Sequence, residues 1–210
     1  MGLTWKLSKQ LLMLQPQPNR TYTYDDLRLW EGEERWELIE GVPYAMSSPS
    51  MLHQALAMEL SGRLWLHFRG GPCRVLAAPF DVRLSERDVV QPDLLVTCDA
   101  DVLQPRFLDG PPQLVIEILS PSNERHDRLR KLNLYARAGV CEYWLVTPHP
   151  FLFEVLRNRS GTFEISGVYS DQDQLKSPTF PDLPLDLADL YQAMPWPQEL
   201  REPAPPYSTV

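Results

Sequence analysis

One short segment limits the folds open to this chain more than any other. Residues 114–119 read Leu-Val-Ile-Glu-Ile-Leu, a continuous apolar run that carries a single carboxylate, Glu117. Strands that are buried on both faces have such runs, whereas strands with one solvated face alternate apolar and polar residues. The run therefore predicts a central strand in a sheet that is covered on both faces, with an acid held inside it.

The residues after this run predict how one face of the sheet is covered. The sequence Ser-Pro-Ser-Asn at 120–123 breaks the run and leads into a helix that reaches about Ala138, where Gly139 stops it. A second buried strand is expected over residues 143–146. A strand, a helix and a strand in this order predict a right-handed crossover between parallel strands.

The rest of the chain supports an α/β domain. A helix is expected over residues 52–68, where leucine recurs every four positions, and further helices over 23–31 and 185–191. Strands are expected over 35–39, 42–46, 74–78, 81–84 and 89–97, with a hairpin of 153–158 and 162–169 near the C-terminus. We expect one domain over 21–194, an N-terminal arm over 1–20 and a Pro-rich tail over 195–210.

Charge and cysteine content narrow the classes of function. The formal net charge is -8, which argues against tight non-specific DNA binding, although site carboxylates of a nuclease add negative charge that metal ions neutralise. Cys73, Cys98 and Cys141 are odd in number and scattered, so neither a disulfide framework nor a zinc site is expected. The chain shows no membrane span and no signal peptide, and these features together predict a cytoplasmic protein.

Two acids carry the chemical prediction. An unpaired carboxylate inside a central strand would cost several kcal/mol, so Glu117 must be neutralised, paired or bound to a cation. Asp93 follows Pro92, which suggests an edge, a bulge or a strand start that re-aims the next side chain. Two neighbouring acids repel each other, and a divalent cation removes the repulsion. Oxygen ligands without paired His or Cys favour Mg²⁺ or Mn²⁺.

Lys131 is the third candidate. It lies on the helix after the Glu117 strand, with Asp127 and Tyr135 four residues away on the same face. From there its ammonium could orient a nucleophile or stabilise charge on a phosphate.

Several of these segments resemble the Uma2 family of restriction endonuclease-like proteins, over a stretch from about Thr21 to Tyr191. The similar segments are residues 36–41, the helix that carries His53, and residues 91–93, 115–122 and 127–146. The resemblance implies the fold of the PD-(D/E)xK nuclease superfamily, with a central mixed sheet, and Mg²⁺-dependent cleavage of DNA. The superfamily lysine should follow the second acid by two residues, but that position is Leu119. The resemblance implies that Lys131 replaces it.

Plain structural interpretations stand beside these roles. Glu117 could form a buried ion pair with Lys131 or an arginine, and Asp93 could be a turn acid. Lys131 could be a solvated helix lysine paired with Asp127, in which case it would have no part in the chemistry.

Weaker candidates accompany this set. Glu37 is either a solvent-facing strand residue or, as the resemblance implies, a further metal or water ligand. His53 is either a helix-capping or core-edge residue or a general base. Tyr135 and Asp81 are weaker candidates of the same kind.

The leading hypothesis is a metal-dependent nuclease that acts on DNA and works as a homodimer. The net negative charge favours single-stranded or structured DNA as its substrate. The alternatives are a non-catalytic module of the same fold that binds nucleic acid or protein, and an enzyme that hydrolyses another phosphodiester.

Overall fold

The computed structural model describes residues 16–17, 19–120 and 130–197, and its main sheet has six strands. In order across the sheet these are β11 (Thr162–Tyr169), β10 (Leu152–Arg159), β9 (Glu142–Thr147), β8 (Leu114–Ile118), β6 (Leu94–Thr97) and β3 (Arg74–Ala77). β8 and β9 are parallel and the other neighbours are antiparallel, so the sheet is mixed, as predicted. The C-terminal hairpin β10–β11 extends this sheet.

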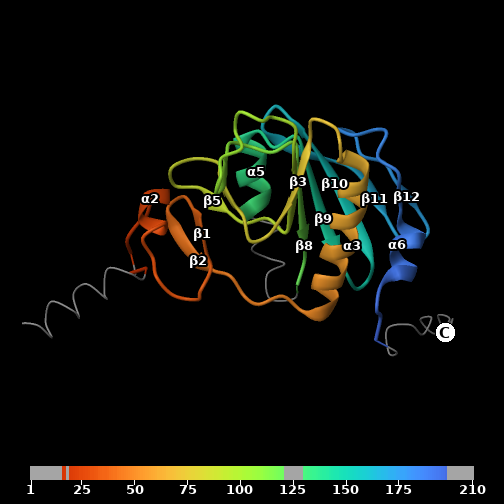
Figure 1. The fold of residues 1–210 in the computed structure, drawn as a ribbon, viewed down its shortest axis with the longest axis horizontal. Coiled ribbons are helices and arrows are strands. Elements are labelled where there is room, and N and C mark those ends of the chain that lie inside the picture. The colour runs from red at the N-terminus through yellow and green to blue at the C-terminus, as the bar shows by residue number, and fades with distance from the viewer. Residues whose placement is uncertain (1–15, 18, 121–129, 198–210) are drawn as a thin grey trace, which may run out of the picture.

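A second, smaller sheet lies beside the main one (Figure 1). Its order is β2 (Val42–Ala45), β1 (Trp36–Ile39), β5 (Val89–Val90), β4 (Asp81–Arg83) and β7 (Phe107–Asp109). The prediction of a single strand over 89–97 is wrong, because β5 belongs to the small sheet and β6 belongs to the main sheet. The break falls at residues 91–93, where Pro92 has no N–H for a ladder hydrogen bond.

Helices cover both faces of the main sheet. α3 (Met51–Phe68) and α6 (Leu187–Ala193) pack on one face, and α5 (Leu132–Ala138) packs on the other. A fourth short helix, α2 (Tyr24–Leu27), follows Thr23, whose side chain forms a capping box with Asp26, and it ends before the predicted limit at residue 31. Among the described residues, none of the helices is long and apolar enough to cross a bilayer.

The central strand β8 is buried along its whole length, as its apolar run predicts. On one face Ile116 belongs to a core cluster with the leucines of α3. On the other face Val115 and Leu119 pack with Leu134 and Tyr135 of α5. Glu117 shares the α5 face, because side chains two residues apart in a strand point the same way.

The crossover between β8 and β9 is described in part. Residues 121–129, which include Asp127 and the first part of the predicted helix, lie outside the described residues. The helix ends as expected at Gly139, which adopts a left-handed conformation with φ of 93°.

The C-terminal part starts with a two-stranded ribbon of β12 (Gln174–Leu175) and β13 (Leu185–Asp186). The helix expected from Leu185 begins two residues later, because Leu185 and Asp186 pair with β12 and the Asp186 side chain caps α6. Trp196, in the predicted Pro-rich tail, is buried against the main core.

The structure corrects the expectation for the cysteines. Cys73 and Cys98 form a disulfide, and Cys141 is the free thiol. The antiparallel register of β3 and β6 pairs Arg74 with Thr97, so the two cysteines follow as the next opposing pair. Sequence spacing did not reveal this pairing, because it depends on which strands are neighbours.

Candidate active site

Asp93 and Glu117 face each other across two neighbouring strands. The register of β6 and β8 pairs Leu94 with Ile116, so Asp93 is opposite Glu117 at the next step. Directly opposed residues lie on the same face with Cβ atoms about 4.5–5.5 Å apart. The break at Pro92 places Asp93 where the chain passes from the small sheet to the main one.

Asp93 is held by one backbone and one side-chain contact. The backbone N–H of Ile118 donates to Asp93 Oδ2 at 2.7 Å, and His53 Nε2 lies 3.1 Å from the same oxygen. The Ser50 side chain caps α3 and accepts from the backbone N–H of His53, which fixes the start of the helix and so the position of the imidazole. His53 Nδ1 is buried and has no hydrogen-bond partner among the described residues.

Two side chains hold Glu117 in place, one from Lys131 at the N-cap of α5 and one from Tyr135 within the helix. Lys131 Nζ donates to Glu117 Oε1 at 2.9 Å, and the Tyr135 hydroxyl donates to the same oxygen at 2.7 Å. Burial, followed by the Glu117 charge, raises the pKa of Tyr135 well above its ordinary value, so the hydroxyl remains protonated. Lys131 is itself buried, and its interpretation as a solvated helix lysine is therefore wrong.

Glu37 joins the same network from the small sheet. Its Oε1 lies 2.9 Å from Lys131 Nζ and accepts from the backbone N–H of Gln91 at 2.8 Å. The side chain is buried, so the alternative of a solvent-facing Glu37 is also wrong. Lys131 is thus one cation shared by two buried carboxylates.

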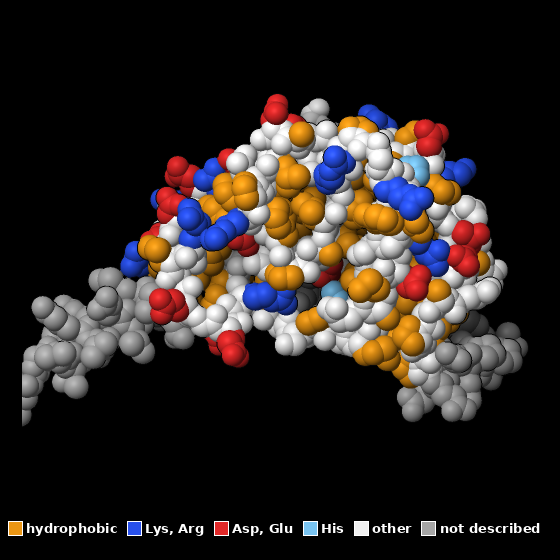
Figure 2. Space-filling view, in the orientation of Figure 1, with side chains coloured by type: hydrophobic (Ala, Val, Ile, Leu, Met, Phe, Trp, Pro, Cys, Tyr) orange, Lys and Arg blue, Asp and Glu red, His pale blue; other side chains and the backbone are white. Residues whose placement is uncertain are grey.

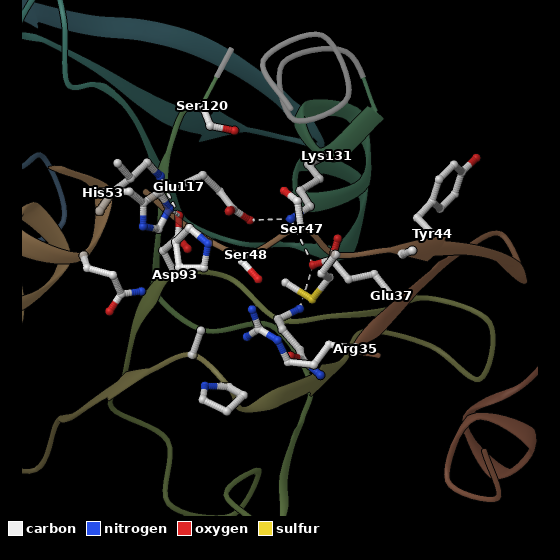
Figure 3. A pocket seen from close by; sticks show the side chains of 18 residues that line it. Arg35, Glu37, Tyr44, Ser47, Ser48, His53, Asp93, Glu117, Ser120 and Lys131 are labelled. Carbon is white, nitrogen blue, oxygen red and sulfur yellow. Dashed lines mark hydrogen bonds and ion pairs between the residues drawn. The ribbon is translucent and has the colours of Figure 1, made fainter. Parts of the chain in front are cut away.

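These residues line a cavity of about 520 Å³ between the two sheets. Its walls come from β1, β2, β8, Gln91 and Asp93 ahead of β6, the start of α3, and the connection from Ala45 to Pro49. Figure 3 shows Asp93, Glu117 and Lys131 pointing toward one another, with His53 beside Asp93. In Figure 2 a hollow opens on this face between the small sheet and α3, with acidic, histidine and basic side chains near it.

The donor set suits a hard divalent cation. Glu37, Asp93 and Glu117 supply three carboxylates to the cavity, against the two cations Lys131 and Arg35. Among the described residues there is no group of three His, Cys, Asp or Glu side chains in a metal-binding arrangement. A cation held by Asp93 and Glu117 would therefore complete its shell with water, as Mg²⁺ usually does.

Gln91 also lines the cavity, and the sequence did not predict a role for it. Gln91 bridges two acids, since its side-chain amide donates to Asp81 Oδ1 at 2.9 Å while its N–H donates to Glu37. Asp81 lines a different cavity, beside Tyr24, and burial raises its pKa. A Pro-flanked glutamine carries no sequence signal for such a bridge.

Glu142 was also missed, and it lies outside the site. This fully buried carboxylate of β9 accepts from the Trp144 indole N–H, the Ser177 hydroxyl at 2.9 Å and the Thr179 N–H at 2.8 Å. These contacts tie the segment after β11 to the main sheet, so Glu142 has a structural role. The sequence signal for a buried Glu142 is its position directly before the apolar run at residues 143–146.

Comparison with known proteins gives relatives in sequence and in fold. An uncharacterized protein of Synechocystis sp., slr1290, is 33% identical over 121 residues, which cover 56% of this chain and 63% of the relative. The match therefore spans less than two thirds of the relative's length. A solved structure from Anabaena variabilis, described as "a putative nuclease belonging to DUF820", has a TM-score of 0.68 at 21% identity and covers 81% of this chain and 98% of its own. This likeness supports the fold.

The family comparison covers most of the domain. Residues 23–188 match Uma2, described as "Putative restriction endonuclease". The matched range contains both sheets, the helices α2, α3 and α5, and every residue of the network around Lys131. The chain belongs to the Uma2 family.

Proposed function

We propose that this protein is a nuclease that uses Mg²⁺ or Mn²⁺ to hydrolyse phosphodiester bonds in DNA. The observation that carries the proposal is the pair Asp93 and Glu117, opposed on neighbouring strands in a cavity, with Lys131 beside them. The family description and the name of the Anabaena relative point to the same class of reaction.

Asp93 and Glu117 would hold the cation. In sites of this kind such a cation supplies a nucleophile at neutral pH and offsets charge on the phosphoryl oxygens. The protein's own donors keep the two carboxylates in place: Ile118 N–H and His53 orient Asp93, and Tyr135 orients Glu117. Positioning of this kind matters because small displacements of a reactive group reduce rates strongly.

Lys131 and His53 have further roles in this proposal. The Lys131 ammonium lies 2.9 Å from Oε1 of both Glu37 and Glu117, and it would stabilise negative charge as it develops on the phosphate. His53 Nδ1 is buried beside the cavity, where it would accept a hydrogen bond from a water or a substrate hydroxyl when Nε2 carries the proton. Glu37 would orient water.

One observation favours a second candidate, a non-catalytic module that binds nucleic acid or protein. Glu117 Oε1 already accepts two hydrogen bonds from protein donors, and Asp93 Oδ2 accepts one from a backbone N–H. The pocket is therefore a stable arrangement in its own right, which a protein that has lost catalysis could retain.

A nuclease assay separates the two candidates. Wild type is incubated with single-stranded and double-stranded DNA in Mg²⁺, Mn²⁺ or EDTA, beside Asp93→Asn, Glu117→Ala and a control, Asp101→Asn. Asp101 is an exposed acid outside the cavity. We expect cleavage that requires metal, is lost in the two site variants by a factor of 100 or more, and persists in the control. Cleavage that survives Glu117→Ala would refute the proposal.

We also propose that the protein is a homodimer. β11 is an outer strand of the main sheet, and its Ile165 and Val168 side chains are 65% and 52% exposed. An exposed apolar edge strand is a template for pairing with a strand of another chain. Light scattering after size-exclusion chromatography measures the mass directly. A monomer at micromolar concentration would contradict this proposal.

A further inference from the structure

We propose that the substrate of this site is an unpaired strand of DNA, one phosphodiester of which enters the cavity while a neighbouring base stacks on Tyr44. This inference rests on the proposed nuclease function and specifies its substrate. It follows from the depth of the site, the size of the cavity and the side chains that the small sheet presents to it.

The reactive groups are accessible only to a slender ligand. The side chains of Glu37 and Glu117 are each 5% exposed and that of Lys131 is 4% exposed, while Asp93 is 17% exposed. A duplex holds its phosphates on the outside of a rigid helix whose major groove is about 12 Å wide. The phosphates of a duplex stay on that surface, so a site this deep favours a strand that is not paired. A single strand can bend one phosphodiester inward.

The size of the cavity agrees with this reasoning. Its volume of about 520 Å³ falls in the range of about 300–1,000 Å³ that is usual for small-molecule sites. Such a space accommodates a nucleotide. The walls come from both sheets, and the connection from Ala45 to Pro49 spans from the small sheet to α3 on this side (Figure 1).

The small sheet presents a cation and an aromatic ring on the face of Glu37. Arg35 precedes Glu37 by two residues, so the two side chains share a face, and the register places Tyr44 directly opposite Glu37. All three line the cavity, and Figure 3 shows Tyr44 at its margin, on the far side of Lys131 from His53. The guanidinium of Arg130 lies 4.7 Å from the centre of the Tyr44 ring.

These groups have the chemistry of a single-strand site. Proteins that bind unpaired strands combine aromatic rings, on which bases stack, with cations along the backbone. Arg35 has no ion pair with an Asp or Glu among the described residues, so its charge is available to a phosphate. A duplex-binding surface needs many phosphate contacts, whereas the cavity offers Arg35 and the already paired Lys131.

Binding is tested apart from cleavage, by fluorescence anisotropy in Mg²⁺ with the Glu117→Gln protein. The probes are a fluorescein-labelled 12-nucleotide single strand of mixed sequence and the duplex of that sequence. We expect the single strand to bind at least tenfold more tightly than the duplex. Tyr44→Ala should weaken single-strand binding about tenfold, and Tyr44→Phe should restore it.

Two further variants sharpen the test. Trp65→Ala is a control, because Trp65 is likewise an aromatic residue with an arginine over its ring, but it lies on α3, is exposed and is outside the cavity. It should leave binding unchanged. Arg35→Gln should weaken binding and lower the slope of log K against log salt by about one.

Each outcome decides a separate point. Equal affinity for strand and duplex, or a loss of binding with Trp65→Ala as large as with Tyr44→Ala, overturns the inference. Wild type that cleaves duplex as fast as single strand also overturns it and leaves the proposed nuclease function intact. Selective single-strand binding that depends on Tyr44, together with no cleavage by wild type, supports the inference and refutes the nuclease.

Discussion

Replacement of Lys131 by methionine tests the electrostatics of the site. Lys131 Nζ lies 2.9 Å from Oε1 of both Glu37 and Glu117, and all three side chains are buried. Removal of one partner from a buried ion pair costs about 3–5 kcal/mol, because the remaining charge stays buried. Methionine keeps the length and most of the volume of the side chain, so the packing loss is small. We therefore expect Lys131→Met to lower the free energy of unfolding by about 3–5 kcal/mol.

The loss is large against the total stability of a domain, which is about 5–15 kcal/mol. It should appear as a drop in Tm of about 10 °C in a chain of this length, and as a lower urea midpoint. Mg²⁺ should raise the Tm of Lys131→Met more than that of wild type, because the cation supplies the missing positive charge. Lys131→Met combined with Glu37→Gln and Glu117→Gln should recover most of the stability.

Two results would refute this reasoning. In the first, Lys131→Met lowers the free energy of unfolding by less than about 1 kcal/mol, which is the value typical of solvent-exposed ion pairs. A triple variant as unstable as the single variant would show that the cost comes from packing and not from charge.

Three further predictions concern stability elsewhere in the fold. Burial raises the pKa of Asp81, so wild type loses stability as pH rises from the ordinary value of 3.8 through the pKa of the folded protein. The urea midpoint of Asp81→Asn relative to that of wild type should therefore increase between pH 3.5 and pH 7. A difference that does not depend on pH would contradict this. Glu142→Gln should cost about 1–3 kcal/mol, because its amide would turn a donor toward a buried donor, whereas Glu164→Gln at an exposed position should change little. Reduction of the Cys73–Cys98 disulfide, which links residues 25 apart, should cost about 3 kcal/mol, and dithiothreitol should lower the Tm of wild type but not that of a Cys73→Ser, Cys98→Ser protein.

The sequence predicted most accurately the positions of residues whose environment is fixed by burial. The apolar run around Glu117 fits a strand with both faces covered, and α5 and α3 cover them. The fourfold spacing of Lys131 and Tyr135 predicted a shared helix face, and both side chains contact Glu117. Local patterns of this kind need no knowledge of distant neighbours.

Features that depend on neighbouring strands could not be predicted. Alternation in β1 shows that Glu37 and Leu38 point to opposite faces, but it does not show that both faces are covered. The division of residues 89–97 between two sheets could not be predicted for the same reason. Pro92 indicates a break in the strand, but it does not show which strands pair with the residues on either side. The Cys73–Cys98 disulfide depends on the pairing of β3 with β6.

The central claim is that Asp93 and Glu117 form a divalent cation site, and isothermal titration with Mn²⁺ tests it most directly. Wild type should bind the ion with measurable affinity, Asp93→Asn and Glu117→Gln should each weaken binding at least tenfold, and Asp101→Asn should bind as wild type does. Absence of binding by wild type at millimolar Mn²⁺, or equal binding by all four proteins, would contradict the account.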